Sequence, residues 1–138
     1  MKPALEAEET RVTVRTDSDI VTARMHGREM ALQLGFSSGP ATLVATAISE
    51  LARNILLYAR GGEITLTPLR TAARRGLMVV ARDEGPGIPD VQRALQDGYS
   101  TSGRLGLGLP GVRRLVDDFS IDTHLGRGTT VVVKKWTV

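Results

Sequence analysis

The chain contains no cysteine, which excludes disulfide bonds and metal sites built from thiolates. No apolar run reaches the ~18 residues that a membrane-spanning helix needs, and the acidic first residues are unlike a signal peptide. We therefore expect a cytoplasmic protein without a membrane partner. Aromatic residues make up only 4% of the chain, and no basic stripe is interleaved with stacking side chains. A nucleic-acid partner is therefore not expected.

What the chain does contain is typical of one globular domain. It has 138 residues, of which 41% are hydrophobic and 24% charged, enough to bury a core of its own. We predict a flexible tail over residues 1–9 and a single domain over residues 10–138. The formal net charge of +3 is modest and is compatible with an acidic partner or with nucleotide phosphates.

The first third of the domain predicts a strand followed by a helix. Polar and β-branched residues alternate over Thr10–Thr16, as in a half-buried strand. Asp17 or Ser18 is suited to cap a helix whose apolar residues recur at helical spacing. Gly35 is expected at the C-terminal end of this helix.

A second helix is predicted to begin at Gly39–Pro40, with proline in its first turn, and to run to about Ala59. Its apolar residues form a broad face at intervals of three and four. Glu50 and Asn54 are four residues apart, so both side chains lie at one edge of that face. Two readings are open for this pair: a solvated rim of the helix, or part of a site.

The remaining elements are mostly strands. Strands are expected at residues 63–67, 77–81, 119–123 and 129–135, with a basic, mobile connection over residues 70–76. Short helices are expected at residues 91–96 and 109–117. Because strands follow one another without crossover helices, we predict an α+β fold. This is a two-layer α/β sandwich with a mixed, mainly antiparallel sheet and helices over one face.

Two glycine-rich stretches point to a ligand. Asp83 follows the apolar strand 77–81 and precedes Gly85 and Gly87, while Gly103, Gly106 and Gly108 precede a helix. Glycines let the backbone approach a bulky ligand, and a helix start offers free N–H groups to phosphate. The spacing matches neither the dinucleotide fingerprint nor the Walker loop. We interpret the two stretches as a nucleotide pocket of another kind, although Asp83 could also be a turn-forming residue.

Four features in a fixed order carry a family resemblance. They are Glu50-x-x-x-Asn54, Asp83-x-Gly85-x-Gly87, Gly103-x-x-Gly106-x-Gly108 and Gly126-x-Gly128-Thr129. This order resembles that of the GHKL ATPase and kinase superfamily, over roughly residues 10–136. Within it, the chain is similar to small bacterial serine/threonine kinases that regulate sigma factors, and particularly to stressosome switch kinases. The stretches that carry the second likeness are Val14–Ile20, Ala47–Asn54, Asp83–Ile88, Gly98–Gly103 and Lys134–Trp136.

The resemblance implies the Bergerat fold and the cofactors ATP and Mg²⁺. Asp83 would accept a hydrogen bond from the adenine amino group, and Asn54 would hold Mg²⁺ through its carbonyl oxygen. Glu50 would take a proton from the attacking hydroxyl group. Arg104 departs from the glycine expected there, so it would either alter the lid or contact phosphate. The other residues expected around the nucleotide are Gly85, Gly87, Ile88, Ser100, Thr101, Ser102, Gly103, Gly106, Leu107, Gly108, Thr129 and Thr130.

The function implied is that of an Mg-ATP-dependent serine/threonine protein kinase. Its expected substrates are STAS-domain proteins of a stressosome, and after release it would bind and activate a PP2C-type phosphatase. Two alternatives stay open. One is an anti-sigma factor that sequesters a sigma subunit and phosphorylates its STAS-domain antagonist. The other is a binding module that holds nucleotide without catalysis.

Overall fold

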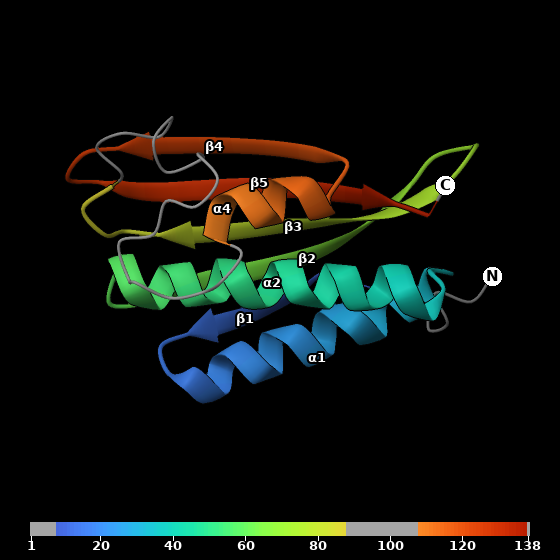
Figure 1. Ribbon diagram of the computed structural model, residues 1–138, viewed down its shortest axis with the longest axis horizontal. Helices are drawn as coiled ribbons and strands as arrows, with labels where there is room; N and C mark the ends of the chain where they lie inside the picture. The colour runs from blue at the N-terminus through green and yellow to red at the C-terminus, as the bar shows by residue number, and fades with distance from the viewer. Residues whose placement is uncertain (1–7, 88–107, 138) are drawn as a thin grey trace.

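A computed structural model describes residues 8–87 and 108–137, and Figure 1 shows their arrangement. The helix expected at residues 91–96 and the loop at residues 98–103 lie outside these ranges. In the described part, three helices and five strands follow one another along the chain. The elements are β1 (Thr10–Val14), α1 (Asp17–Gln33), α2 (Ser38–Tyr58), β2 (Gly62–Arg70), β3 (Arg75–Asp83), α4 (Gly108–Leu115), β4 (Asp118–His124) and β5 (Gly128–Trp136).

The five strands form one sheet in the order β1-β2-β3-β5-β4. All four pairings of neighbouring strands are antiparallel, so the expectation of a mixed sheet is wrong for the described strands. The reason lies in the connections. The pair α1 and α2 returns the chain to the end at which β1 stopped, and β5 enters between β3 and β4, which run in the same direction. The α+β sandwich itself is confirmed.

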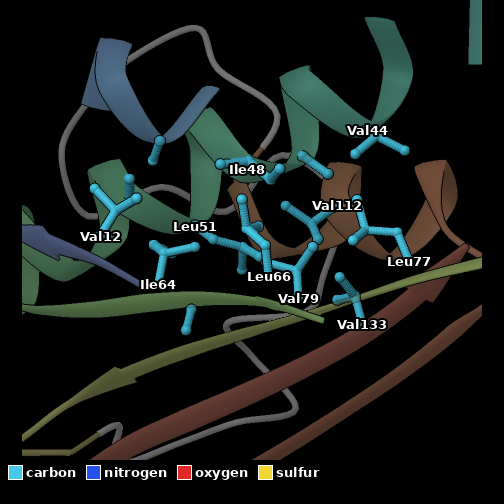
Figure 2. Close-up of a cluster of buried hydrophobic side chains, with 14 of the residues drawn as sticks. Val12, Val44, Ile48, Leu51, Ile64, Leu66, Leu77, Val79, Val112 and Val133 are labelled. Atoms are coloured by element: carbon cyan, nitrogen blue, oxygen red, sulfur yellow. The ribbon is translucent and has the colours of Figure 1, made fainter. Parts of the chain in front are cut away.

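The helices cover one face of the sheet, and the core lies between the two layers (Figures 1 and 2). Figure 2 shows Ile48 and Leu51 of α2 above Ile64 and Leu66 of β2. Alternation along each strand sends every second side chain into this core. The largest fully buried side chains are Leu34, Ile48, Leu51, Ile64, Leu66, Leu77, Val14, Val112 and Val133.

Helices α1 and α2 cross closely because Gly27 has no side chain. A Cβ atom at Gly27 would stand 2.0 Å from Cδ1 of the buried Ile48. The end of the Ile48 side chain thus occupies the space over Gly27, where α1 and α2 pack together. Among residues 8–87 and 108–137, no helix is both long and apolar enough to cross a membrane.

The start of α1 differs from the prediction. Strand β1 ends at Val14, and Thr16 is the N-cap residue, rather than Asp17 or Ser18. Asp19 stabilises this start of the helix, because its Oδ2 accepts hydrogen bonds from the backbone N–H groups of Arg15 and Thr16 at 2.8 and 3.0 Å. These bonds hold the pKa of Asp19 below its ordinary value of 3.8, because they favour the charged carboxylate.

Two other boundaries also move. The connection at residues 70–76 is a tight hairpin, since Arg70 pairs with Arg75. The hydroxyl of Thr71 accepts the N–H groups of Ala73 and Arg74 at 3.2 and 3.1 Å, which closes the turn. Helix α4 ends at Leu115, two residues earlier than predicted, because the following strand begins at Asp118.

Candidate nucleotide site

A pocket opens between α2 and the end of the sheet formed by β3 and β5. One edge of α2 contributes side chains three and four residues apart, which is the spacing of neighbours on a helix. Strands β3 and β5 contribute alternate residues from the face that packs against the helices. The lining residues are Leu51, Asn54, Ile55, Tyr58, Ala81, Asp83, Leu109, Thr129 and Val131.

Asp83 lies in this pocket at the last position of β3. Its Oδ1 accepts a hydrogen bond from the N–H of Gly85 at 2.9 Å. Asp83 is therefore a turn-forming residue, which was one of the two interpretations of its sequence position. The bond uses only one of the two carboxylate oxygens. Because a carboxylate can accept several hydrogen bonds, Asp83 can close this turn and still bind a donor in the pocket through its other oxygen.

The two glycines after Asp83 have reasons of their own in the fold. A Cβ at Gly85 would lie 2.8 Å from the carbonyl oxygen of Tyr58, so glycine lets this loop pack on the end of α2. Gly87 has φ +82°, and a Cβ there would meet the carbonyl oxygen of His124 at 2.7 Å. Glycine at both positions therefore lets the segment after Asp83 pass close to the end of α2 and to His124 at the end of β4.

Glu50 lies one turn before Asn54 on the same edge of α2. Its Oε2 pairs with Nη1 of Arg53 at 2.5 Å, and its Oε1 accepts the N–H of Gly108 at 3.4 Å. Gly108 has φ +58° and is the first residue of α4. The carboxylate of Glu50 therefore spans the gap between α2 and the start of α4, next to pocket residue Leu109.

Thr129 and Thr130 lie on opposite faces of β5. Thr129 is buried, pairs with Asp83 across the sheet and lines the pocket, and its hydroxyl is 2.8 Å from that of Thr123. Thr130 is the next residue along the strand, so its side chain points to the face without helices. Of these two threonines, the fold brings Thr129 to the pocket.

Several residues expected at the site lie outside the described part of the chain. Other residues lie at the site but were not predicted from the sequence. Those outside are Ile88, Ser100, Thr101, Ser102, Gly103, Arg104, Gly106 and Leu107. Arg53 was missed, although its charge three residues after Glu50 is a recognisable pair on a helix. The apolar lining was also missed, because residues such as Leu51 and Ile55 belong to the apolar face that packs in the core. Tyr58, which is 39% exposed, was missed because no pattern in the sequence singles it out.

The chemistry of the pocket suits a nucleoside triphosphate. Aliphatic side chains from α2, β3 and β5 offer walls for a flat base, and the carboxylate of Asp83 is an acceptor for its amino group. Asn54, which also lines the pocket, carries one neutral amide oxygen that could serve as a metal ligand. Among residues 8–87 and 108–137, no three His, Cys, Asp or Glu side chains are grouped to hold a metal. A magnesium ion here would therefore depend on the phosphates for most of its ligands, as it usually does.

Comparison with known proteins defines the class of protein. Residues 39–137 match the family described as histidine kinase-, DNA gyrase B- and HSP90-like ATPases. That range holds most of the chain and every lining residue of the pocket. The chain belongs to this family, which confirms the GHKL superfamily and the expectation of ATP as ligand.

The particular relatives narrow the class. The chain is 49% identical to serine/threonine-protein kinase RsbT of Bacillus subtilis over 125 residues, which cover 91% of this chain and 94% of RsbT. It is 26% identical to the anti-sigma F factor of Geobacillus stearothermophilus, covering 82% of this chain and 81% of that factor. The expected enzyme class, a serine/threonine protein kinase like RsbT, is confirmed by the first of these relatives.

Solved structures confirm the fold. The RsbU and RsbW domains of Rv1364c from Mycobacterium tuberculosis align with a TM-score of 0.62 at 17% identity, over 94% of this chain and 32% of that one. The catalytic domain of histidine kinase ThkA aligns with a TM-score of 0.53 at 15% identity, over 95% and 97% of the two chains. At these identities, the likeness concerns the fold alone.

Proposed function

We propose that this kinase uses Mg-ATP to phosphorylate a serine or threonine of STAS-domain stressosome proteins in the cytoplasm. When released from them, it binds and activates a PP2C-type phosphatase. The observation that carries the proposal is that Asp83, Asn54 and Thr129 line one pocket, with Glu50 one turn before Asn54 on α2. The 49% identity to RsbT over nearly the whole of both chains supports the choice of pathway.

Each side chain has a separate task in this proposal. Asp83 accepts the adenine amino group through the oxygen that Gly85 does not use. Asn54 is the magnesium ligand. Glu50 takes the proton of the acceptor hydroxyl group as its oxygen attacks phosphorus. When bound, Mg-ATP supplies the γ-phosphoryl group. Gly106 and Gly108 are proposed to hold the phosphates by their backbone N–H groups, and the hydroxyl groups of Ser100, Thr101 and Ser102 to add donors. The other expected residues outside the described ranges, Ile88, Gly103, Arg104 and Leu107, are proposed as further contacts of the nucleotide.

The proposed catalytic pair is tested by labelling a STAS-domain partner with γ-labelled ATP. Replacing Glu50 by Ala removes the proton acceptor, so kcat should fall by roughly 10²–10⁴-fold. Asn54→Ala should abolish the magnesium-dependent part of transfer. Glu29→Ala, which removes an exposed glutamate of α1, is the control and should transfer like the wild type. Undiminished transfer by both site variants would exclude this catalytic pair.

A second candidate is an anti-sigma factor that sequesters a sigma subunit and phosphorylates its STAS-domain antagonist. The 26% identity to anti-sigma F factor over four fifths of both chains supports it. The two candidates differ in what the protein binds, not in the pocket. Purification from the native cell decides between them: a large STAS assembly supports the first, and a stoichiometric sigma subunit supports the second.

A further inference from the structure

The ion pair between Glu50 and Arg53 differs from a typical surface pair. Nη1 of Arg53 lies 2.5 Å from Oε2 of Glu50, and the two side chains are 28% and 15% exposed. The pair of Arg11 and Glu9 offers a contrast: its atoms are 3.6 Å apart, and its side chains are 68% and 48% exposed. Removing two charges from water costs free energy that their attraction barely offsets. A contribution to folding stability therefore does not by itself explain why Glu50 and Arg53 form a half-buried ion pair.

The two oxygens of the Glu50 carboxylate have different partners. Arg53 binds Oε2 from one turn further along α2, and the N–H of Gly108 binds Oε1 from the start of α4. A free glutamate side chain rotates about three bonds, whereas this one is held at both oxygens by separate elements. The carboxylate is thereby directed toward the N-terminal end of α4, where N–H groups face outward.

We propose that Arg53 is a positioning residue for Glu50, an inference that depends on the proposed function. The planar guanidinium group of Arg53 approaches Oε2 from the next turn of the same helix, so it can hold the Glu50 carboxylate in one orientation. Its contact with Oε2 fixes the rotamer of Glu50 and leaves Oε1 turned to α4. Oε1, the oxygen that Arg53 does not bind, is the one that would receive the proton of the acceptor hydroxyl group. Arg53 acts through Glu50 and touches no reacting atom.

The test compares Arg53→Gln with the matched control Arg11→Gln, which also breaks an Arg–Glu pair but at the surface. Arg53→Gln should lower kcat for phosphoryl transfer on the order of 10–100-fold, the usual effect of losing a partner that orients a reactive group. KM for ATP should stay within about twofold, because the adenine contacts remain. Arg53→Lys keeps the charge without the planar fork and should recover part of the rate. Arg11→Gln should behave as the wild type.

A second readout needs no activity. In the nucleotide-free protein, the amide resonance of Gly108 reports the carboxylate at its N–H. It should move in Glu50→Gln and in Arg53→Gln, and stay in place in Arg11→Gln. Suppose that the wild type transfers phosphate, but Arg53→Gln has an unchanged kcat or an unmoved Gly108 resonance. Either result would overturn the role of Arg53, while the proposed kinase activity would still hold.

Failure of the proposed function looks different. A wild type that transfers no phosphate, with Gly108 still responding to Arg53→Gln, would end the kinase proposal while Arg53 would still orient Glu50. If Arg53→Gln does not fold, Arg53→Lys carries both measurements. A wild-type kcat and an unmoved Gly108 resonance in that variant would overturn the proposal.

Discussion

At the scale of single residues, one carboxylate can satisfy the fold and the ligand together. Asp83 closes a turn through Oδ1 and lines the pocket, so the structural and the functional reading of this residue are compatible. Thr129 is similar: it is buried, bonded to Thr123, and part of the pocket wall. Side chains of this kind are poorly tested by alanine, because alanine removes both roles at once.

Asp83→Asn separates the two roles. The asparagine keeps an oxygen for the N–H of Gly85 but presents an NH₂ group to the adenine amino group, which is also a donor. Losing the bond should cost about 1.5–3 kcal/mol, or about 10–150-fold in ATP affinity, while the melting temperature stays close to that of the wild type. Calorimetry with Mg-ATP measures the first and thermal unfolding the second. An unchanged affinity would contradict adenine recognition by Asp83.

At the scale of elements, helix ends and close crossings place the site. Ile48 of α2 packs over Gly27 of α1, and α2 carries Glu50 and Asn54 at one edge. The start of α1 is held by Asp19, whose pKa is lowered by hydrogen bonds from the backbone of Arg15 and then of Thr16. Capping at this point orients α1, and α1 in turn supports α2.

The lowered pKa of Asp19 predicts how this capping depends on pH. Because the folded state favours the carboxylate, the stabilisation is fully present above the ordinary value of 3.8 and is lost as pH falls through the lower folded value. Asp19→Ala should lower the melting temperature near neutral pH, and its deficit should shrink below pH 3.8. Asp17→Ala, in the same turn of the helix, is the control. A deficit that stays constant with pH would exclude the capping role.

At the scale of the whole molecule, the pocket joins α2, β3, α4 and β5, which are far apart in the chain. A ligand bound there connects both layers of the sandwich and stabilises the folded state by mass action. The open face of the sheet takes no part in this pocket. The size of this stabilisation depends on the ligand concentration relative to Kd, and Kd in turn depends on how well the ligand binds Asp83.

Mg-ATP at 100 times its Kd should stabilise the protein by about 2.7 kcal/mol, which raises the melting temperature by roughly 5–11 °C. Thermal unfolding with Mg-GTP at the same concentration is the control. Guanine presents an oxygen where adenine presents its amino group, so the carboxylate of Asp83 would repel it, and the shift should be much smaller. Equal shifts with both nucleotides would show that the base is not read at Asp83.

Most of the helices and strands, and the family, could be predicted from the amino-acid sequence. Helical periodicity identified α2, and alternation or a continuous apolar run identified the strands, because each depends on local geometry. The series of Glu50, Asn54 and the glycine motifs predicted the family through its spacing. Sequence could not choose between Thr129 and Thr130, nor reveal the contact of Arg53 with Glu50. Those facts depend on which face a strand buries and on the rotamer of a helix side chain.

The sequence by itself determined the order of the described helices and strands, the α+β class and the nucleotide chemistry, since short-range patterns carry that information. Only the tertiary structure decided that the sheet is antiparallel throughout its described strands. It also decided that Gly85 and Gly87 serve packing, and that the Glu50 carboxylate joins α2 to α4. Such features arise between segments distant in sequence, where packing and the satisfaction of polar groups select one arrangement.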